Sequence, residues 1–154
     1  MAYLLDTNIL LRSVQPDHPM HGTALAALSS LGSAKERLTI VPQVIVEFWT
    51  VSTRPIANNG LGLTPRQAQT EIETILTTFE LLPETPALFD EWRTLVVEHS
   101  VSGVETHDAR IVAAMKLYGI THILTFNEQD FRRYQSILTV VVPLTFLTQP
   151  RADS

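Results

Sequence analysis

The chain has 154 residues, 45% of them hydrophobic and 18% charged, which is enough for one domain with a sizeable core and excludes a wholly disordered chain. It contains no cysteine, so disulfides and thiolate zinc sites are excluded. The formal net charge of −5 at pH 7 is unfavourable for general attraction to nucleic acid, which usually depends on Lys and Arg.

The first half of the chain alternates short apolar runs with segments of helical spacing. It predicts a strand at 2–5, a helical turn at 8–13, a helix at 18–31, a strand at 38–41, and a helix that begins at Pro42 and ends before Arg54. Proline suits the first turn of a helix because the N–H that it lacks would have no partner there. A loop at 58–62 follows.

The second half of the chain continues the alternation. It predicts a helix from Thr64 to about Phe79, a short strand at 81–82, a helix at 86–99, a helix capped by Thr106 that runs to 117 or 118, a strand at 121–126, a short helix capped by Asn127 and a last strand at 139–142. The Thr64-Pro65-Arg66-Gln67 run is a strong helix start because it can form a capping box. Gly119 is placed to end the preceding helix.

Strands separated by helices predict an α/β fold, in which a central, mostly parallel sheet is flanked by helices. The pattern predicts one domain over residues 1–146 and a polar C-terminal tail over 147–154. No apolar run approaches the roughly 20 residues of a membrane helix, and the N-terminus does not resemble a signal peptide. We therefore expect a cytoplasmic protein with no membrane contact.

Four acidic residues, Asp6, Glu47, Asp108 and Asp130, lie within or beside apolar segments. A carboxylate in such surroundings must pair, accept hydrogen bonds or hold a cation. Hard divalent ions prefer oxygen ligands. Asp6 and Asp130 follow predicted strands, and the carboxyl ends of parallel strands are where ligands bind in such sheets. If all four acids converge, they predict a metal-dependent nuclease.

Each acid also has a simpler structural interpretation. Asp6, with Thr7 and Asn8, can cap a helix; Glu47 can pair with Arg54; Asp108 can interact with a helix dipole; and Asp130 can bond back toward Asn127. Similarly, Arg12, Arg54, Arg66, Arg110, Arg132 and Arg133 can form a phosphate-binding rim or ordinary solvated surface. Sequence alone does not decide between these interpretations.

Taken together, four motifs resemble those of the PIN-domain nucleases. They are Leu5-Asp6-Thr7-Asn8, Glu47 in the middle of a helix, His107-Asp108-Ala109 with Val112-Ala113-Ala114, and Thr125-Phe126-Asn127-Glu128-Gln129-Asp130-Phe131. Among these nucleases, the chain is most similar to the VapC-type toxins of bacterial toxin–antitoxin pairs. The resemblance extends from Met1 to about Leu144.

The resemblance implies an acidic pocket that binds Mg²⁺ or Mn²⁺ and hydrolyses RNA. The matching acids are Asp6, Glu47, Asp108 and Asp130, and the matching polar residues that would orient ligands or waters are Thr7, Asn8, Thr125 and Asn127. The first and third acids would be direct ligands of the first ion, and the others would complete the site. A metal-activated water would then attack the phosphorus, so no side-chain nucleophile is needed.

The resemblance also implies a cognate antitoxin protein and a homodimer as partners. Two other functions remain to be weighed. A PIN-like scaffold could bind RNA or protein without cutting, and loss of an acid would favour it, but no acid is missing. A phosphatase with an aspartyl nucleophile would need a second Asp two residues after Asp6, where Asn8 stands.

Overall fold

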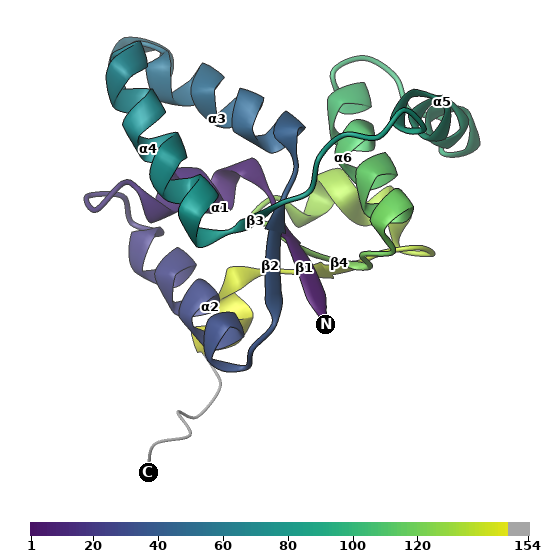
Figure 1. Cartoon of the computed structure of the whole chain (residues 1–154), viewed down its shortest axis with the longest axis horizontal. Coiled ribbons are helices and arrows are strands. Elements are labelled where there is room, and N and C mark those ends of the chain that lie inside the picture. Colours follow the sequence, from purple (N-terminus) through teal and green to yellow (C-terminus); the bar gives the residue numbers. More distant parts are fainter. Residues whose placement is uncertain (148–154) are drawn as a thin grey trace.

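The computed structural model describes residues 1–147 and has a five-stranded sheet with helices on both faces (Figure 1). The strand order is β3-β2-β1-β4-β5, and all neighbouring strands are parallel. The strands are β1 (Ala2–Leu5), β2 (Arg37–Ile40), β3 (Glu80–Leu81), β4 (His122–Leu124) and β5 (Thr139–Val141). This confirms the predicted α/β fold with a central parallel sheet.

Helices connect the successive strands. The α-helices are α1 (Thr7–Ser13), α2 (His21–Ser33), α3 (Pro42–Thr53), α4 (Pro65–Thr78), α5 (Leu88–Glu98) and α6 (Glu105–Tyr118). The 3₁₀ helices are η1 (Ile56–Asn58), η2 (Glu128–Tyr134) and η3 (Pro143–Leu147). Helices α1, α2 and α4 lie on one side of the sheet and α5 and α6 on the other (Figure 1). None of the helices within residues 1–147 is long and apolar enough to cross a membrane.

Local sequence signals determine several helix ends. The Thr64 hydroxyl accepts a hydrogen bond from the Gln67 backbone N–H at 3.1 Å, and the Gln67 side chain accepts one from the Thr64 N–H at 2.9 Å. This reciprocal pair confirms the predicted capping box of α4. Gly119 ends α6 with a positive φ of 68°, a conformation that glycine adopts without a steric cost.

Two predicted helix starts are wrong. Helix α2 begins at His21 rather than His18, because Pro19 disfavours the helical conformation of the residue before it. The His18 ring instead accepts a hydrogen bond from the Met20 backbone N–H at 3.0 Å. Thr106 does not cap α6, because α6 starts at Glu105, one residue before Thr106. The Thr106 hydroxyl instead donates a hydrogen bond to the Gly103 carbonyl at 2.8 Å.

The C-terminal end of the described chain has more structure than the sequence predicts. Residues Pro143–Leu147 form η3 directly after β5, and the half-buried Phe146 packs against the core. Of the predicted polar tail at 147–154, Leu147 is the last residue of η3. The rest of that tail lies outside the described residues.

The core surrounds the two central strands. Leu4, Leu5, Ile123 and Leu124 are fully buried, as expected for parallel strands that are covered on both faces. From β1, the chain adds β2 and then β3 toward one edge of the sheet. It then crosses to the other side of β1 and adds β4 and β5 toward the opposite edge, so the strand order reverses between β1 and β4. Such a reversal leaves a crevice at the carboxyl ends of the two strands.

Candidate active site

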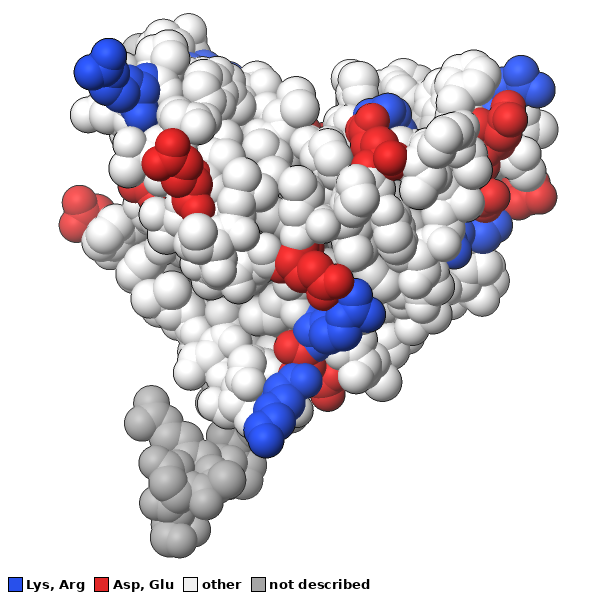
Figure 2. Space-filling view, in the orientation of Figure 1, with Lys and Arg blue, Asp and Glu red and all other residues white. Residues whose placement is uncertain are grey.

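A cavity of about 400 Å³ lies at the carboxyl ends of β1 and β4. Figure 2 shows the outline of the molecule notched between the α3–α4 side and the α5–α6 side. The cavity is lined by Asp6, Thr7, Asn8, Leu11, Arg12, Glu47, Thr50, Val51, Arg54, Asp108, Asn127 and Asp130. All four acids singled out from the sequence therefore face one cavity, together with three of the four polar residues.

Asp6 is buried at the end of β1, where it also caps α1. Its Oδ1 accepts a hydrogen bond from the Thr7 backbone N–H at 2.8 Å. Its Oδ2 accepts hydrogen bonds from the Thr125 hydroxyl at 2.7 Å and from the Asn8 side-chain amide at 3.2 Å. The capping interpretation of Asp6 is thus correct. It is compatible with a role in the cavity, because the carboxylate that caps α1 also lines the cavity.

Thr125, the fourth polar residue, is fully buried beneath the cavity. Besides donating to Asp6, its hydroxyl accepts hydrogen bonds from the Asn8 side chain at 3.2 Å and from the Asn127 backbone N–H at 3.0 Å. The Asn8 side-chain oxygen accepts from the Phe126 N–H at 3.1 Å. These bonds join the end of β1 to the end of β4 and hold the Asp6 carboxylate in one orientation.

Glu47 is held from two sides on the inner face of α3. Its Oε2 accepts a hydrogen bond from the Thr7 hydroxyl at 2.6 Å, and its Oε1 accepts one from the Gln43 side-chain amide at 3.0 Å. It forms no ion pair with Arg54 in the described part of the chain, so that alternative is not supported. The carboxylate is therefore oriented by two neutral donors.

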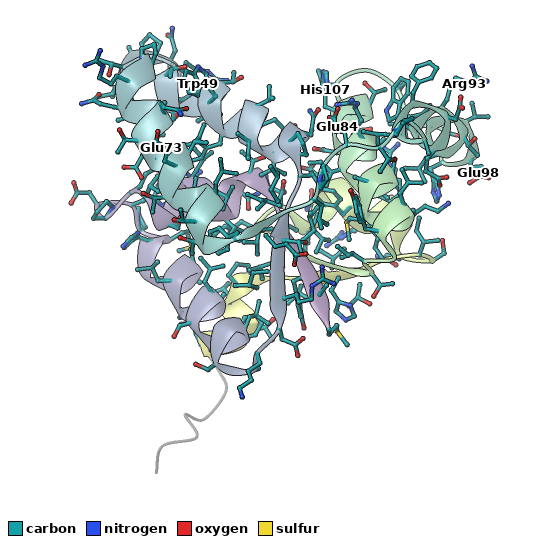
Figure 3. All side chains as sticks on the ribbon, viewed as in Figure 1. Trp49, Glu73, Glu84, Arg93, Glu98 and His107 are labelled. Atoms are coloured by element: carbon teal, nitrogen blue, oxygen red, sulfur yellow. The ribbon has the colours of Figure 1, made fainter. Side chains whose placement is uncertain are left out.

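Gln43 was not singled out from the sequence, and Arg110 was named only as a possible member of a phosphate-binding rim. The Arg110 guanidinium donates to the Gln43 side-chain oxygen at 3.0 Å and pairs with Glu84 at 3.3 Å. Figure 3 shows Glu84 beside α6, across the notch from Trp49 on α3. Arg110 thereby directs the amide N–H of Gln43 toward Glu47. The spacing of four residues between Gln43 and Glu47 in one helix was the signal that could have suggested the pair.

Asp108 and Asp130 face the cavity without a protein partner. Neither side chain forms a hydrogen bond or an ion pair with any residue in the described range 1–147. Burial, followed by repulsion from the carboxylates of Asp6, Asp130 and Glu47, raises the pKa of Asp108 to about 7. Burial also raises the pKa of Asp6 to about 6, although hydrogen bonds from Thr125 and Thr7 oppose the rise. The cavity therefore gathers four carboxylates, none of which forms an ion pair with a cationic side chain in residues 1–147.

This donor set suits a hard divalent cation by its chemistry, because every candidate ligand is an oxygen. Two observations support the fit: the half-buried Asp108 carboxylate has no partner in residues 1–147, and the neighbouring acids repel it. Within residues 1–147, however, no three His, Cys, Asp or Glu side chains are grouped closely enough to hold one ion. Ion binding would therefore require the carboxylates to draw together by side-chain rotation.

Comparison with known proteins decides the family. The model of the PIN domain family matches residues 3–136, which is most of the chain. The chain belongs to the PIN domain family. No curated protein matches its sequence.

Solved structures share the fold of this PIN domain at low sequence identity. VapBC2 from Rickettsia felis, bound to a promoter DNA fragment, has a TM-score of 0.69 at 18% identity, with 92% of this chain and 98% of that chain covered. The Mycobacterium tuberculosis toxin VapC20, which cleaves the sarcin–ricin loop, has a TM-score of 0.62 at 19% identity, with coverages of 90% and 97%. FitAcB from Neisseria gonorrhoeae has a TM-score of 0.60 at 20% identity, with coverages of 94% and 99%. The fold is therefore that of the toxins in toxin–antitoxin pairs.

The raised pKa values predict that the metal-free PIN domain loses stability as the pH rises. Asp6 and Asp108 titrate at about pH 4 in an unfolded chain but at about 6 and about 7 in the folded one. The folded state therefore favours the protonated forms, so their contribution to stability is complete below about pH 4 and is lost as the pH passes through 6 and 7. We expect the Tm in EDTA to fall by several degrees between pH 5 and pH 8. A Tm that rises over this range would contradict the assignment.

Proposed function

We propose that this PIN domain is a Mg²⁺- or Mn²⁺-dependent endoribonuclease and the toxin of a toxin–antitoxin pair. One observation carries the proposal: four carboxylates from four separate elements line one cavity, and two of them have no partner in residues 1–147. Uncompensated acids at the carboxyl edge of a parallel sheet are costly to fold, and binding a cation would offset that cost. The family and the fold point the same way.

One group of residues would hold an ion, and a second group would orient the carboxylates of the first. Asp6 and Asp108 would hold the first ion, and Glu47 and Asp130 would complete the site. A bound divalent cation supplies positive charge at the scissile phosphate and acidifies water. Thr125 and Asn8 orient the Asp6 carboxylate, and Asn127 contributes its backbone N–H to Thr125.

General acid–base chemistry by histidine has no support in the cavity. The residues that line it include neither His nor Cys. His107, next to Asp108 in the sequence, is exposed at the start of α6 and is absent from the lining (Figure 3). A hydrolytic reaction at this site would therefore depend on carboxylates and a cation rather than on a side-chain nucleophile.

The proposed partners are RNA, an antitoxin and a second copy of the chain. The antitoxin is supported by the similar structures, several of which are toxin–antitoxin complexes. Exposed apolar side chains on and beside α5, namely Phe89, Val97 and Val104, offer a surface for protein contact. A cytoplasmic location belongs to the same proposal.

The silent scaffold is less well supported, because all four acids of the family pattern are present around the cavity.

Chelation tests the proposed chemistry. Purified protein is incubated with total bacterial RNA, and new RNA ends are mapped by sequencing. We expect cleavage with Mg²⁺ or Mn²⁺, loss of cleavage to background in EDTA, and recovery when either ion is returned in excess. Cleavage that survives exhaustive chelation would overturn the metal-dependent mechanism. Tight RNA binding with no new ends under any ion would support the silent scaffold instead.

A further inference from the structure

The structure divides the arginines that the sequence suggests as a phosphate-binding rim into those that form ion pairs and those that do not. Three of them are occupied by acidic partners: Arg110 pairs with Glu84, Arg132 with Glu128 and Arg133 with Glu105. Arg12 and Arg54 line the acidic cavity, yet neither forms an ion pair with any acid in residues 1–147. Arg66 is also unpaired in that range, but it lies on the first turn of α4, outside the cavity.

The backbone of Arg54 is held firmly at the end of α3. The loop after η1 returns to it, and the Gly62 N–H donates to the Arg54 carbonyl at 2.9 Å. Gly60 packs so closely that a Cβ there would lie 1.9 Å from the same carbonyl oxygen. The loop therefore requires glycine at position 60, and it fixes the backbone of Arg54, whose exposed side chain lines the cavity.

Arg12 is half-buried in the last turn of α1. One guanidinium N–H donates to the Gln15 side chain at 2.6 Å, and its backbone carbonyl lies 2.8 Å from the His21 ring nitrogen. The remaining guanidinium N–H groups have no acceptor within the described residues. A guanidinium that is partly desolvated and unpaired is costly, and an anion with oxygen acceptors would relieve that cost.

The positions of the charges give the cavity a direction. The acids lie near the sheet, at the start of α1, in the middle of α3, at the start of α6 and in η2, whereas the two arginines end α1 and α3. Arg54 is the C-cap of α3 and follows Glu47 by seven residues, which corresponds to about 10 Å along the helix axis. A polyanion that spans the cavity would thus meet carboxylates at one end and guanidinium groups at the other.

We propose that Arg12 and Arg54 bind a backbone phosphate of the RNA strand to one side of the cleavage position. This inference rests on the proposed function and specifies how its substrate is held. The planar guanidinium donates two parallel hydrogen bonds to phosphate oxygens, which suits it to this contact better than a lysine. Contacts to phosphate position a strand without reading its sequence. The pair therefore sets where the strand lies, and the choice of cleavage sequence falls to other residues.

RNA binding by non-cleaving protein tests the proposal. Arg12→Gln, Arg54→Gln and the double variant are made in an Asp108→Asn background, and binding of a fluorescein-labelled, mixed-sequence, single-stranded RNA 20-mer is followed by anisotropy from 50 to 200 mM NaCl. We expect each single variant to raise Kd about tenfold, and each lost contact to reduce the slope of log K against log salt by about 0.7. Arg54→Lys should fall between the wild-type side chain and glutamine.

Arg66→Gln in the same background is the matched control, because it removes an unpaired arginine outside the cavity. It should change Kd by less than twofold. If Arg12→Gln and Arg54→Gln weaken binding no more than Arg66→Gln does, the proposed contact is overturned while the nuclease proposal stands. If wild-type protein neither binds RNA nor cuts it with Mg²⁺ or Mn²⁺, the proposed function fails and this inference fails with it. Circular dichroism and Tm confirm that each variant is folded.

Discussion

Replacing Asp108 with asparagine is expected to reduce RNA cleavage by about a hundredfold to a thousandfold while making the metal-free protein more stable. The loss of activity follows because the carboxylate would be a direct ligand of the cation, and removing one preorganised electrostatic group costs about 10²–10³ in rate. The gain in stability follows because Asp108 has no protein partner in the described chain and is repelled by the other acids. An amide of the same shape carries no charge to be repelled.

The two effects are measured on the same preparation. Cleavage is followed with excess Mg²⁺, and thermal unfolding is followed in EDTA at pH 8, where the wild-type carboxylate is ionised. Asp90→Asn is the matched control, since Asp90 is exposed in the first turn of α5, where a negative charge favours the helix dipole. That control should keep full activity and lose a little stability. Full activity of Asp108→Asn would remove this residue from the mechanism.

Replacing Thr125 with valine is expected to destabilise the fold by about 2–4 kcal/mol. Valine has nearly the same shape but lacks the hydroxyl that donates to Asp6 and accepts from Asn8 and Asn127. Because Thr125 and Asp6 are buried, the Asp6 carboxylate regains its bond from water only poorly, and a buried group left unsatisfied costs about 1–3 kcal/mol, or more where it is charged. The corresponding fall in Tm is about 10 °C.

Urea and thermal unfolding of Thr125→Val measure this cost. Thr70→Val on α4 is the control, because its hydroxyl is exposed and donates only to the Arg66 carbonyl within its own helix. Its effect should stay within about 0.5 kcal/mol. We also expect Thr125→Val to cut RNA more slowly, since the Asp6 carboxylate loses its shortest side-chain hydrogen bond. Equal stability of the two variants would show that the Thr125 hydroxyl is dispensable.

The layout of the sheet was predictable because its signals are local. Apolar runs of four to six residues, separated by segments of helical spacing, determine the number and direction of the strands. The capping box at Thr64 and the glycine at position 119 placed two helix ends for the same reason. The start of α2 was misplaced although its cause, the proline at position 19, is also local. Helix η3 was not predicted because it depends on packing against α2, which no local pattern reports.

The candidate site was only partly predictable. The four acids stood out because carboxylates are unusual in apolar segments, but their convergence depends on strand order. The partners of Glu47 illustrate the limit: Gln43 is one turn away in the same helix, whereas Thr7 is 40 residues away in the sequence. Which arginines are consumed in ion pairs also depends on packing, so the sequence could not separate Arg54 from Arg110 or Arg133.

The hydrogen bond between Asp6 and Thr125 joins residues that are 119 positions apart, and it has a consequence for protein synthesis. A ribosome makes β1 more than a hundred residues before β4, yet the two strands are neighbours at the centre of the sheet. Until β4 emerges, β1 has one edge unpaired and the Asp6 carboxylate lacks the hydroxyl that orients it. A growing polypeptide therefore cannot assemble the acidic cavity until the ribosome has also made β4 and the segment that carries Asp130.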